Sequence, residues 1–103
     1  MGNDFLDGLT PPVRAQYEAL KKSYVEGLAH RLSEMEQAMV RSDWIALRAC
    51  AHRLRGSGVS YGFEALGALA QQLEEKCDAR AIGEIPQSLD AVNQEIARIL
   101  SVR

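Results

Sequence analysis

His52 is the residue of this sequence that is best placed to do chemistry. The stretch 44–60 around it predicts an amphipathic helix whose inward face consists of Leu47, Ala51, Leu54 and Gly58, with Trp44 at its edge. On a helix that turns about 100° per residue, His52 points roughly 120° away from the centre of that face. Its imidazole is therefore predicted to be exposed, with a ring nitrogen open to a reacting group.

Two arginines and a glycine lie one predicted helical turn before or after His52, at positions i−4, i+3 and i+4. A neutral imidazole can attack phosphorus through Nε2, and Arg48 or Arg55 can balance the charge on the transferring oxygens. A glycine inside a helix costs about 1 kcal/mol relative to alanine, so Gly56 indicates that bulk must be absent beside the ring. These residue types together favour phosphoryl transfer at His52.

Small and apolar residues continue this surface along the same helix. Ala49 lies one turn from His52, and Ile45 and Val59 lie two turns away. An exposed helix face normally carries Glu, Lys and Gln, so this rim suits the transient docking of a partner protein. The simpler interpretation, an ordinary surface histidine, accounts for exposure but not for these neighbours.

The first two helices that position these residues follow from the apolar pattern. One long helix is predicted over 13–41, with apolar residues at Val13, Tyr17, Leu20, Tyr24, Leu28, Leu32, Met35 and Met39. Asp43 is predicted to cap the second helix by accepting free N–H groups of its first turn. That helix should end near Gly62, which can take the left-handed conformation that closes a helix.

Two further helices complete the pattern. The third is predicted from Phe63 to Cys77, before a loop over 78–83, and the fourth opens at Pro86. The inward face of the fourth helix is Leu89, Val92, Ile96 and Leu100, with Ile99 beside it. Four amphipathic helices with short connections predict an all-α, antiparallel four-helix bundle. We expect the N-terminal segment to cover one end of the core with Phe5 and Leu6.

Composition narrows the possible functions. With 103 residues the chain is predicted to be a single domain, 1–103, because a second core would leave each half too small. A net charge of −2 gives no basic stripe, so nucleic acid is not an expected partner. No apolar run approaches the roughly 18 to 20 residues that span a bilayer, and no signal peptide opens the chain. We therefore expect a cytoplasmic protein without a membrane segment.

Other reactive side chains are interpreted as structural or as solvated. Cys50 and Cys77 are expected to be buried free thiols, and no metal site is expected because the potential ligands lie on different helix faces. His30 is interpreted as a plain surface histidine. Glu74, Glu75 and Asp78 are interpreted as a solvated acidic face. The chain has no phosphate-binding loop, so it should neither bind ATP nor phosphorylate itself.

A longer motif surrounds His52, and it consists of Ala51, His52, Arg53, Leu54, Arg55, Gly56 and Ser57, followed by Tyr61, Gly62 and Leu66. Flanking residues extend the pattern at Asp43, Trp44, Leu47, Leu69, Leu73 and Glu74. Together they resemble the signature of histidine-containing phosphotransfer (HPt) domains of two-component phosphorelays. The resemblance covers about 28–75, on the predicted helix and at the predicted exposed position.

The resemblance implies roles for individual residues. His52 matches the phosphoacceptor, Arg55 the basic residue that helps to hold the phosphoryl group, and Gly56 the small residue that clears space beside it. The basic position is more often lysine, so Arg55 keeps the charge but changes the hydrogen-bond geometry. Ser57 matches a small residue, to which we assign packing or a hydrogen bond.

The resemblance also implies partners. These are response-regulator receiver domains, together with a sensor or hybrid histidine kinase, and the Mg²⁺ required for transfer is expected in the receiver. The chain itself is expected to need no cofactor and to be a monomer. It would act as a phosphotransfer protein rather than an autonomous kinase, accepting the phosphoryl group from a receiver aspartate or a kinase module and donating it to another receiver.

Three alternatives remain open at this point. The chain could dock receivers without accepting phosphate, or it could be a purely structural bundle, which leaves Gly56 unexplained. It could also be the phosphoacceptor region of a histidine kinase, where an acidic residue typically follows the histidine. Arg53 occupies that position here.

Overall fold

The structure, a computed structural model, describes residues 8–103. Its elements are α2 (Pro11–Glu26), α3 (Leu28–Val40), α4 (Trp44–Ser60), α5 (Glu64–Asp78), the 3-10 turn η1 (Ile82–Glu84) and α6 (Ile85–Ser101). Within this range there is no strand, which confirms the all-α prediction. The predicted covering role of Phe5 and Leu6 falls outside the described residues.

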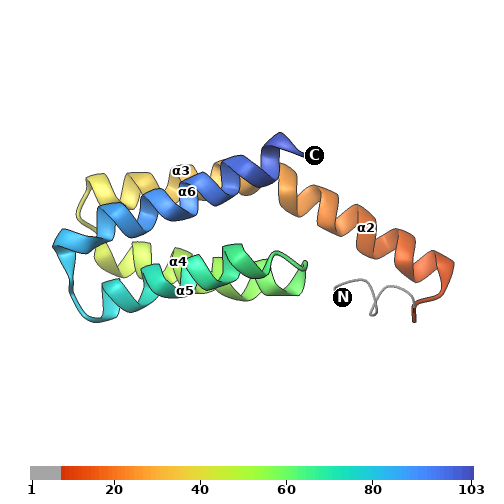
Figure 1. The fold of residues 1–103 in the computed structure, drawn as a ribbon, viewed down its shortest axis with the longest axis horizontal. Coiled ribbons are helices and arrows are strands. Elements are labelled where there is room, and N and C mark those ends of the chain that lie inside the picture. Colours follow the sequence, from red (N-terminus) through yellow and green to blue (C-terminus); the bar gives the residue numbers. More distant parts are fainter. Residues whose placement is uncertain (1–7) are drawn as a thin grey trace.

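Four of these helices form the bundle. In Figure 1, α3 and α6 lie side by side in one layer, and α4 and α5 lie side by side in the other. Short connections join successive helices, which is typical of antiparallel neighbours. All four contribute fully buried side chains to one core, among them Leu28, Leu47, Leu66, Leu73, Val92 and Ile96. The predicted four-helix bundle is confirmed.

The prediction of one helix over 13–41 is wrong, because the helix is interrupted at Gly27. Gly27 has φ −86° and ψ −5°, and α3 starts again at the next residue. Glycine is among the poorest helix formers, which makes it the weakest point of a long helix. Figure 1 shows α2 leaving the bundle at this point. Val13 and Leu20, predicted on the inward face, are 47% and 59% exposed.

The ends of α4 follow the prediction. The Asp43 carboxylate accepts a hydrogen bond from the Ala46 N–H at 3.1 Å, as expected of an N-terminal cap. Beyond the helix, Gly62 has φ +83°, a conformation that residues with a Cβ rarely adopt. The helix that carries His52 is therefore fixed at both ends by residues suited to those positions.

Two glycines allow α4 and α5 to pack closely. A Cβ atom on Gly58 would lie 3.2 Å from the Gly67 backbone nitrogen, and one on Gly67 would lie 3.2 Å from the Arg55 carbonyl oxygen. Both positions therefore require the smallest residue for the helices to keep this separation. The prediction that Gly58 lies on the inward face of α4 is confirmed.

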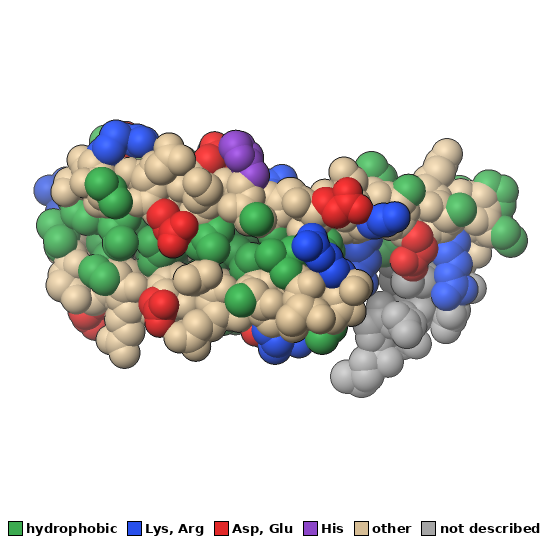
Figure 2. Space-filling view, turned by 90° about the horizontal axis from the view of Figure 1, so that it is seen from above, with side chains coloured by type: hydrophobic (Ala, Val, Ile, Leu, Met, Phe, Trp, Pro, Cys, Tyr) green, Lys and Arg blue, Asp and Glu red, His purple; other side chains and the backbone are tan. Residues whose placement is uncertain are grey.

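Details at the other helices differ slightly from the prediction. Ile99 is buried, whereas Leu100 packs only at the margin of the core, so the inward face of α6 is rotated by one residue at its end. Cys77 is buried as expected, but Cys50 is only partly buried. Figure 2 shows the molecule from above, where hydrophobic side chains form a band along the bundle and charged side chains of both signs are scattered around it. Among residues 8–103 no helix could cross a membrane.

Candidate functional site

His52 lies on the outer face of α4. Its side chain is 56% exposed, while the neighbouring Ala51 and Leu54 point into the core. The exposure predicted from the helical wheel is confirmed. Because Ala51 and Leu54 anchor this turn of the helix, the imidazole projects from a fixed backbone into solvent.

Glu74 of α5 holds the imidazole from one side. Its Oε2 atom lies 2.9 Å from His52 Nδ1, and its side chain is only 6% exposed. A carboxylate can only accept hydrogen bonds, so Nδ1 donates the proton and the lone pair of the ring lies on Nε2. This contact selects the tautomer whose exposed nitrogen is nucleophilic.

Arg48 and Arg55 also bind Glu74. Arg48 Nη2 lies 3.2 Å from Oε2, and Arg55 Nη1 lies 3.2 Å from Oε1. The buried carboxylate thus has a partner on each oxygen, as a buried charge requires. Arg48 is bound further by Asp78, whose hydrogen bond raises the pKa of Arg48 above its usual value. Arg55 makes no second ion pair within residues 8–103, so fewer contacts restrain it than restrain Arg48.

The structure thus brings together three of the predicted site residues and adds one. His52, Arg48 and Arg55 meet at Glu74. The interpretation of Glu74 as part of a solvated face is wrong, because close packing of α4 and α5 buries its carboxylate. A signal for this was present in the sequence, because Gly67, Ala70, Glu74 and Cys77 recur at helical spacing and form the face of α5 that is buried.

The remaining predicted residues lie along the same exposed strip of α4. A Cβ on Gly56 would meet no atom within 4 Å, so the space beside it is open. Ile45 is 85% exposed, Val59 is exposed and Ala49 is partly buried. The rim predicted for docking is therefore largely accessible to a partner.

Ser57 and His30 have other surroundings. The Ser57 hydroxyl lies 2.8 Å from the Tyr24 hydroxyl, which links α4 to α2. His30 is exposed and lies 3.6 Å from Glu34 of its own helix, which confirms a plain surface histidine. Within residues 8–103, no group of three or more His, Cys, Asp and Glu side chains could hold a metal ion.

The family model for the Hpt domain matches residues 19–102. Searches of curated proteins and of solved structures found no significant match. The family match includes α4 with His52 and α5 with Glu74, as well as the other two helices of the bundle. The chain therefore belongs to the Hpt domain family, whose members carry out phosphotransfer in two-component signalling and interact with receiver domains.

Proposed function

We propose that this chain is a phosphorelay intermediate whose His52 accepts a phosphoryl group from a receiver aspartate, or from a kinase module, and passes it to another receiver aspartate. The observation that supports this most directly is the contact of His52 Nδ1 with the buried Glu74 carboxylate. In the neutral imidazole, that contact keeps the proton on Nδ1 and leaves the lone pair on Nε2. The nucleophile is therefore prepared before a partner binds.

In the proposed transfer, Nε2 attacks the phosphorus of an aspartyl phosphate. The P–N bond forms as the acyl P–O bond breaks, and the aspartate leaves as a carboxylate. The ring becomes an imidazolium that still carries its proton on Nδ1, and Glu74 stabilises that positive charge. The reverse sequence returns the phosphoryl group to a second aspartate. No proton has to move between residues of this chain.

Arg55 is proposed to steady the phosphoryl oxygens. It is partly exposed, close to His52 and bound to Glu74 by one contact of 3.2 Å, so it can turn toward an incoming anion. Arg48 is proposed as a weaker contributor, because Asp78 also binds it. The Mg²⁺ ion and its acidic ligands are proposed to belong to the receiver.

The test is transfer of labelled phosphate from a phosphorylated receiver. We expect wild-type protein to become labelled and the adduct to be labile in acid and stable in base, as a phosphoramidate is. The variant His52→Gln should accept no label, while His30→Gln, which alters the exposed histidine of α3, should be labelled like wild type. Label retained by His52→Gln would contradict the proposal. Equal receiver affinity without transfer in either protein would instead support a bundle that only docks.

The proposed oligomeric state follows from the fold. We expect the chain to act as a monomer, since all four helices of the bundle come from one chain, and we propose that it acts in the cytoplasm. A sedimentation mass of one chain would agree with this arrangement. A dimer would favour the phosphoacceptor region of a histidine kinase instead.

A further inference from the structure

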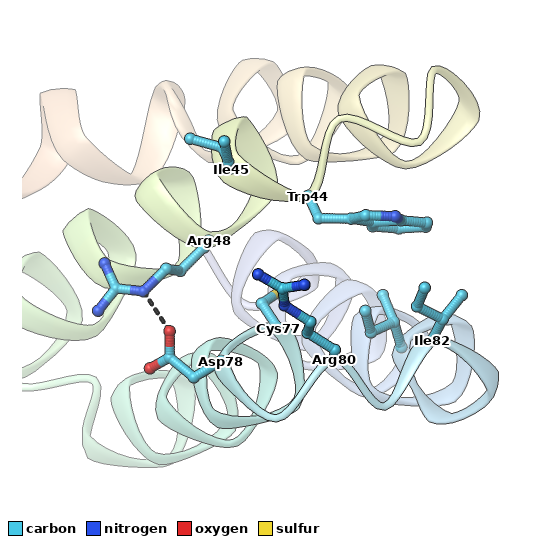
Figure 3. A pocket seen from close by; sticks show the side chains of 8 residues that line it. Trp44, Ile45, Arg48, Cys77, Asp78, Arg80 and Ile82 are labelled. Carbon is cyan, nitrogen blue, oxygen red and sulfur yellow. Dashed lines mark hydrogen bonds and ion pairs between the residues drawn. The ribbon is translucent and has the colours of Figure 1, made fainter.

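A groove of about 400 Å³ opens beside the His52 surface, at the end of the bundle near η1. One wall is the start of α4, with Trp44, Ile45 and Arg48. The opposite wall is the connection between α5 and α6, with Arg80 and Ile82 (Figure 3). Of these residues, Arg48 has a role in the function proposed above, and Ile45 belongs to the rim predicted for docking.

The groove has an apolar and a cationic part. Figure 3 shows the Trp44 ring and the Ile82 side chain on one side, and Arg80 extending toward α4 between them and the Arg48–Asp78 pair. Ile45 is largely exposed, and Ile82 is 51% exposed. Exposed apolar side chains that line a hollow are typical of sites where a protein binds.

Among the described residues of the groove, Arg80 is the cation without a carboxylate partner. Within residues 8–103, Arg48 pairs with Glu74 and Asp78, but no ion pair includes Arg80. Its backbone has φ +53°, in the left-handed region that side chains other than Gly, Asn and Asp rarely adopt. The loop therefore presents an unpaired guanidinium from an uncommon backbone conformation.

The groove is continuous with the surface that a partner must cover to reach His52. Ile45 precedes His52 by seven residues on α4, which corresponds to about 10 Å along the helix axis. A standard protein interface covers about 800 Å² on each partner, which corresponds to a patch of about 16 Å radius. A receiver centred on His52 therefore reaches this groove.

We propose that the groove binds the receiver domain that exchanges phosphate with His52, by taking an apolar side chain of the receiver between Trp44 and Ile82 and a neighbouring carboxylate at Arg80. This inference rests on the proposed function, because it takes a receiver as the partner. It adds the 79–84 connection to the α4 surface as a determinant of which receiver binds. Receivers without that pair of side chains would be bound more weakly.

The test measures receiver affinity by the fluorescence of Trp44, the single tryptophan of the chain, with a receiver that lacks tryptophan, and labelling of His52 by the same receiver is measured separately. Arg80→Asn removes the charge with a residue that tolerates the left-handed backbone. We expect it to weaken affinity about fivefold, and the double variant Arg80→Asn with Ile82→Ala about 20-fold. Arg80→Lys should remain within about twofold of wild type, because it keeps the charge.

A matched control uses Lys22, an exposed cation on α2 at the other end of the molecule. Lys22→Asn should leave receiver affinity unchanged. Phosphoramidate, a small donor that needs no docking, should label His52 equally in all of these variants. Together these controls separate loss of docking from loss of charge and from damage to His52.

Several results would overturn the proposal. Wild-type affinity in the double variant would do so, as would Trp44 fluorescence that does not respond to the receiver. A sedimentation mass of two chains that falls to one in the double variant would show that a second copy occupies the groove. If the receiver bound the groove but neither donor labelled His52, the proposed function would fail and the groove proposal would stand.

Discussion

α4 and α5 form the most extensive contact of the bundle, whereas α2 leaves the bundle and keeps apolar side chains exposed. At the α4–α5 contact, Gly58 and Gly67 bring two backbones together, and the same approach buries Glu74 against His52. On α2, Val13 and Leu20 face solvent. The comparison indicates that the chemistry depends on one helix pair, and that equal hydrophobicity in the sequence does not imply equal burial.

The sharpest test of this difference is to replace a leucine by alanine once in α5 and once in α2. Leu73 of α5 is fully buried next to Glu74, and Leu20 of α2 is mostly exposed. We expect Leu73→Ala to lower the free energy of unfolding by about 3 kcal/mol, because it removes buried methyl groups and leaves a cavity. Leu20→Ala should change it by less than about 0.5 kcal/mol.

Urea unfolding of both variants measures this difference. The two variants lose the same atoms, so the difference between them reports burial alone. Equal losses would contradict the comparison and would show that the exposed face of α2 is covered in solution.

The second prediction uses two glycines of one helix. Gly56→Ala should raise the free energy of unfolding by about 1 kcal/mol, because alanine favours the helix and its methyl group meets no atom within 4 Å. Gly58→Ala should lower it by about 1 kcal/mol, because strain against the Gly67 backbone outweighs the same gain. The substitutions are chemically identical and lie on opposite faces of α4.

The same two variants also test the site, when the rate of phosphoryl transfer to His52 is measured. Gly56→Ala should slow transfer from a receiver although the protein is more stable, if this space is reserved for the partner. Faster or equal transfer would remove the steric role predicted for Gly56. For Gly58→Ala we expect slower transfer together with lower stability. The added methyl group pushes α5 away from α4, and Glu74 moves away from His52 with it.

Most of the fold could be predicted because the local signals were strong. Asp43 and Gly62 mark the ends of α4 by the chemistry of their own side chains, independently of tertiary contacts. The break at Gly27 could have been predicted only by comparing the length of the predicted helix with the lengths of the helices that it packs against. A helix over 13–41 would be about 44 Å long, far longer than its 15-residue to 17-residue partners can cover.

The site was predicted in part. The exposure of His52 follows from helix geometry alone, since Leu47 and Ala51 fix which face turns inward. The role of Glu74 depends on how closely α5 approaches α4, and Gly67 permits that approach only as the partner of Gly58. A carboxylate next to Glu75 on an amphipathic helix ordinarily faces water, so single-helix patterns led to the wrong assignment.

The third prediction concerns the contact between Glu74 and the imidazole. Glu74→Gln keeps the shape of the side chain and can still accept from Nδ1, but it removes the charge that stabilises the imidazolium. Hydrogen bonds to charged groups exceed neutral ones by about 1 to 1.5 kcal/mol, so we expect transfer to slow about tenfold. Rapid-quench measurement of labelled His52 tests this.

A control for the loss of negative charge is Glu75→Gln, at the exposed neighbouring position of α5. It should transfer at the wild-type rate. A transfer rate of Glu74→Gln equal to that of wild type would mean that Glu74 only supports the helix contact. Nitrogen chemical shifts of His52 should show the same tautomer in Glu74→Gln as in wild type, because the glutamine oxygen still accepts from Nδ1, so slower transfer would report the lost charge.

The smallest expected effect lies where α2 meets α4. Tyr24→Phe removes the hydrogen bond of 2.8 Å to Ser57 but keeps the ring stacked on Tyr61 at 4.7 Å between centroids. We expect the free energy of unfolding to fall by about 0.5 to 1 kcal/mol, the usual contribution of one such bond. Transfer at His52 should not change, since the hydrogen bonds of Ser57 within residues 8–103 go to Tyr24 and Leu54 and not to Glu74.

A double-mutant cycle with Ser57→Ala isolates that bond from the other contacts of each side chain. The coupling energy should equal the loss in Tyr24→Phe if the hydroxyl pair is the whole link. A coupling near zero would attribute the anchoring of α2 to aromatic stacking instead. A change in transfer rate would contradict the division between the two regions, because it would mean that α2 also positions His52.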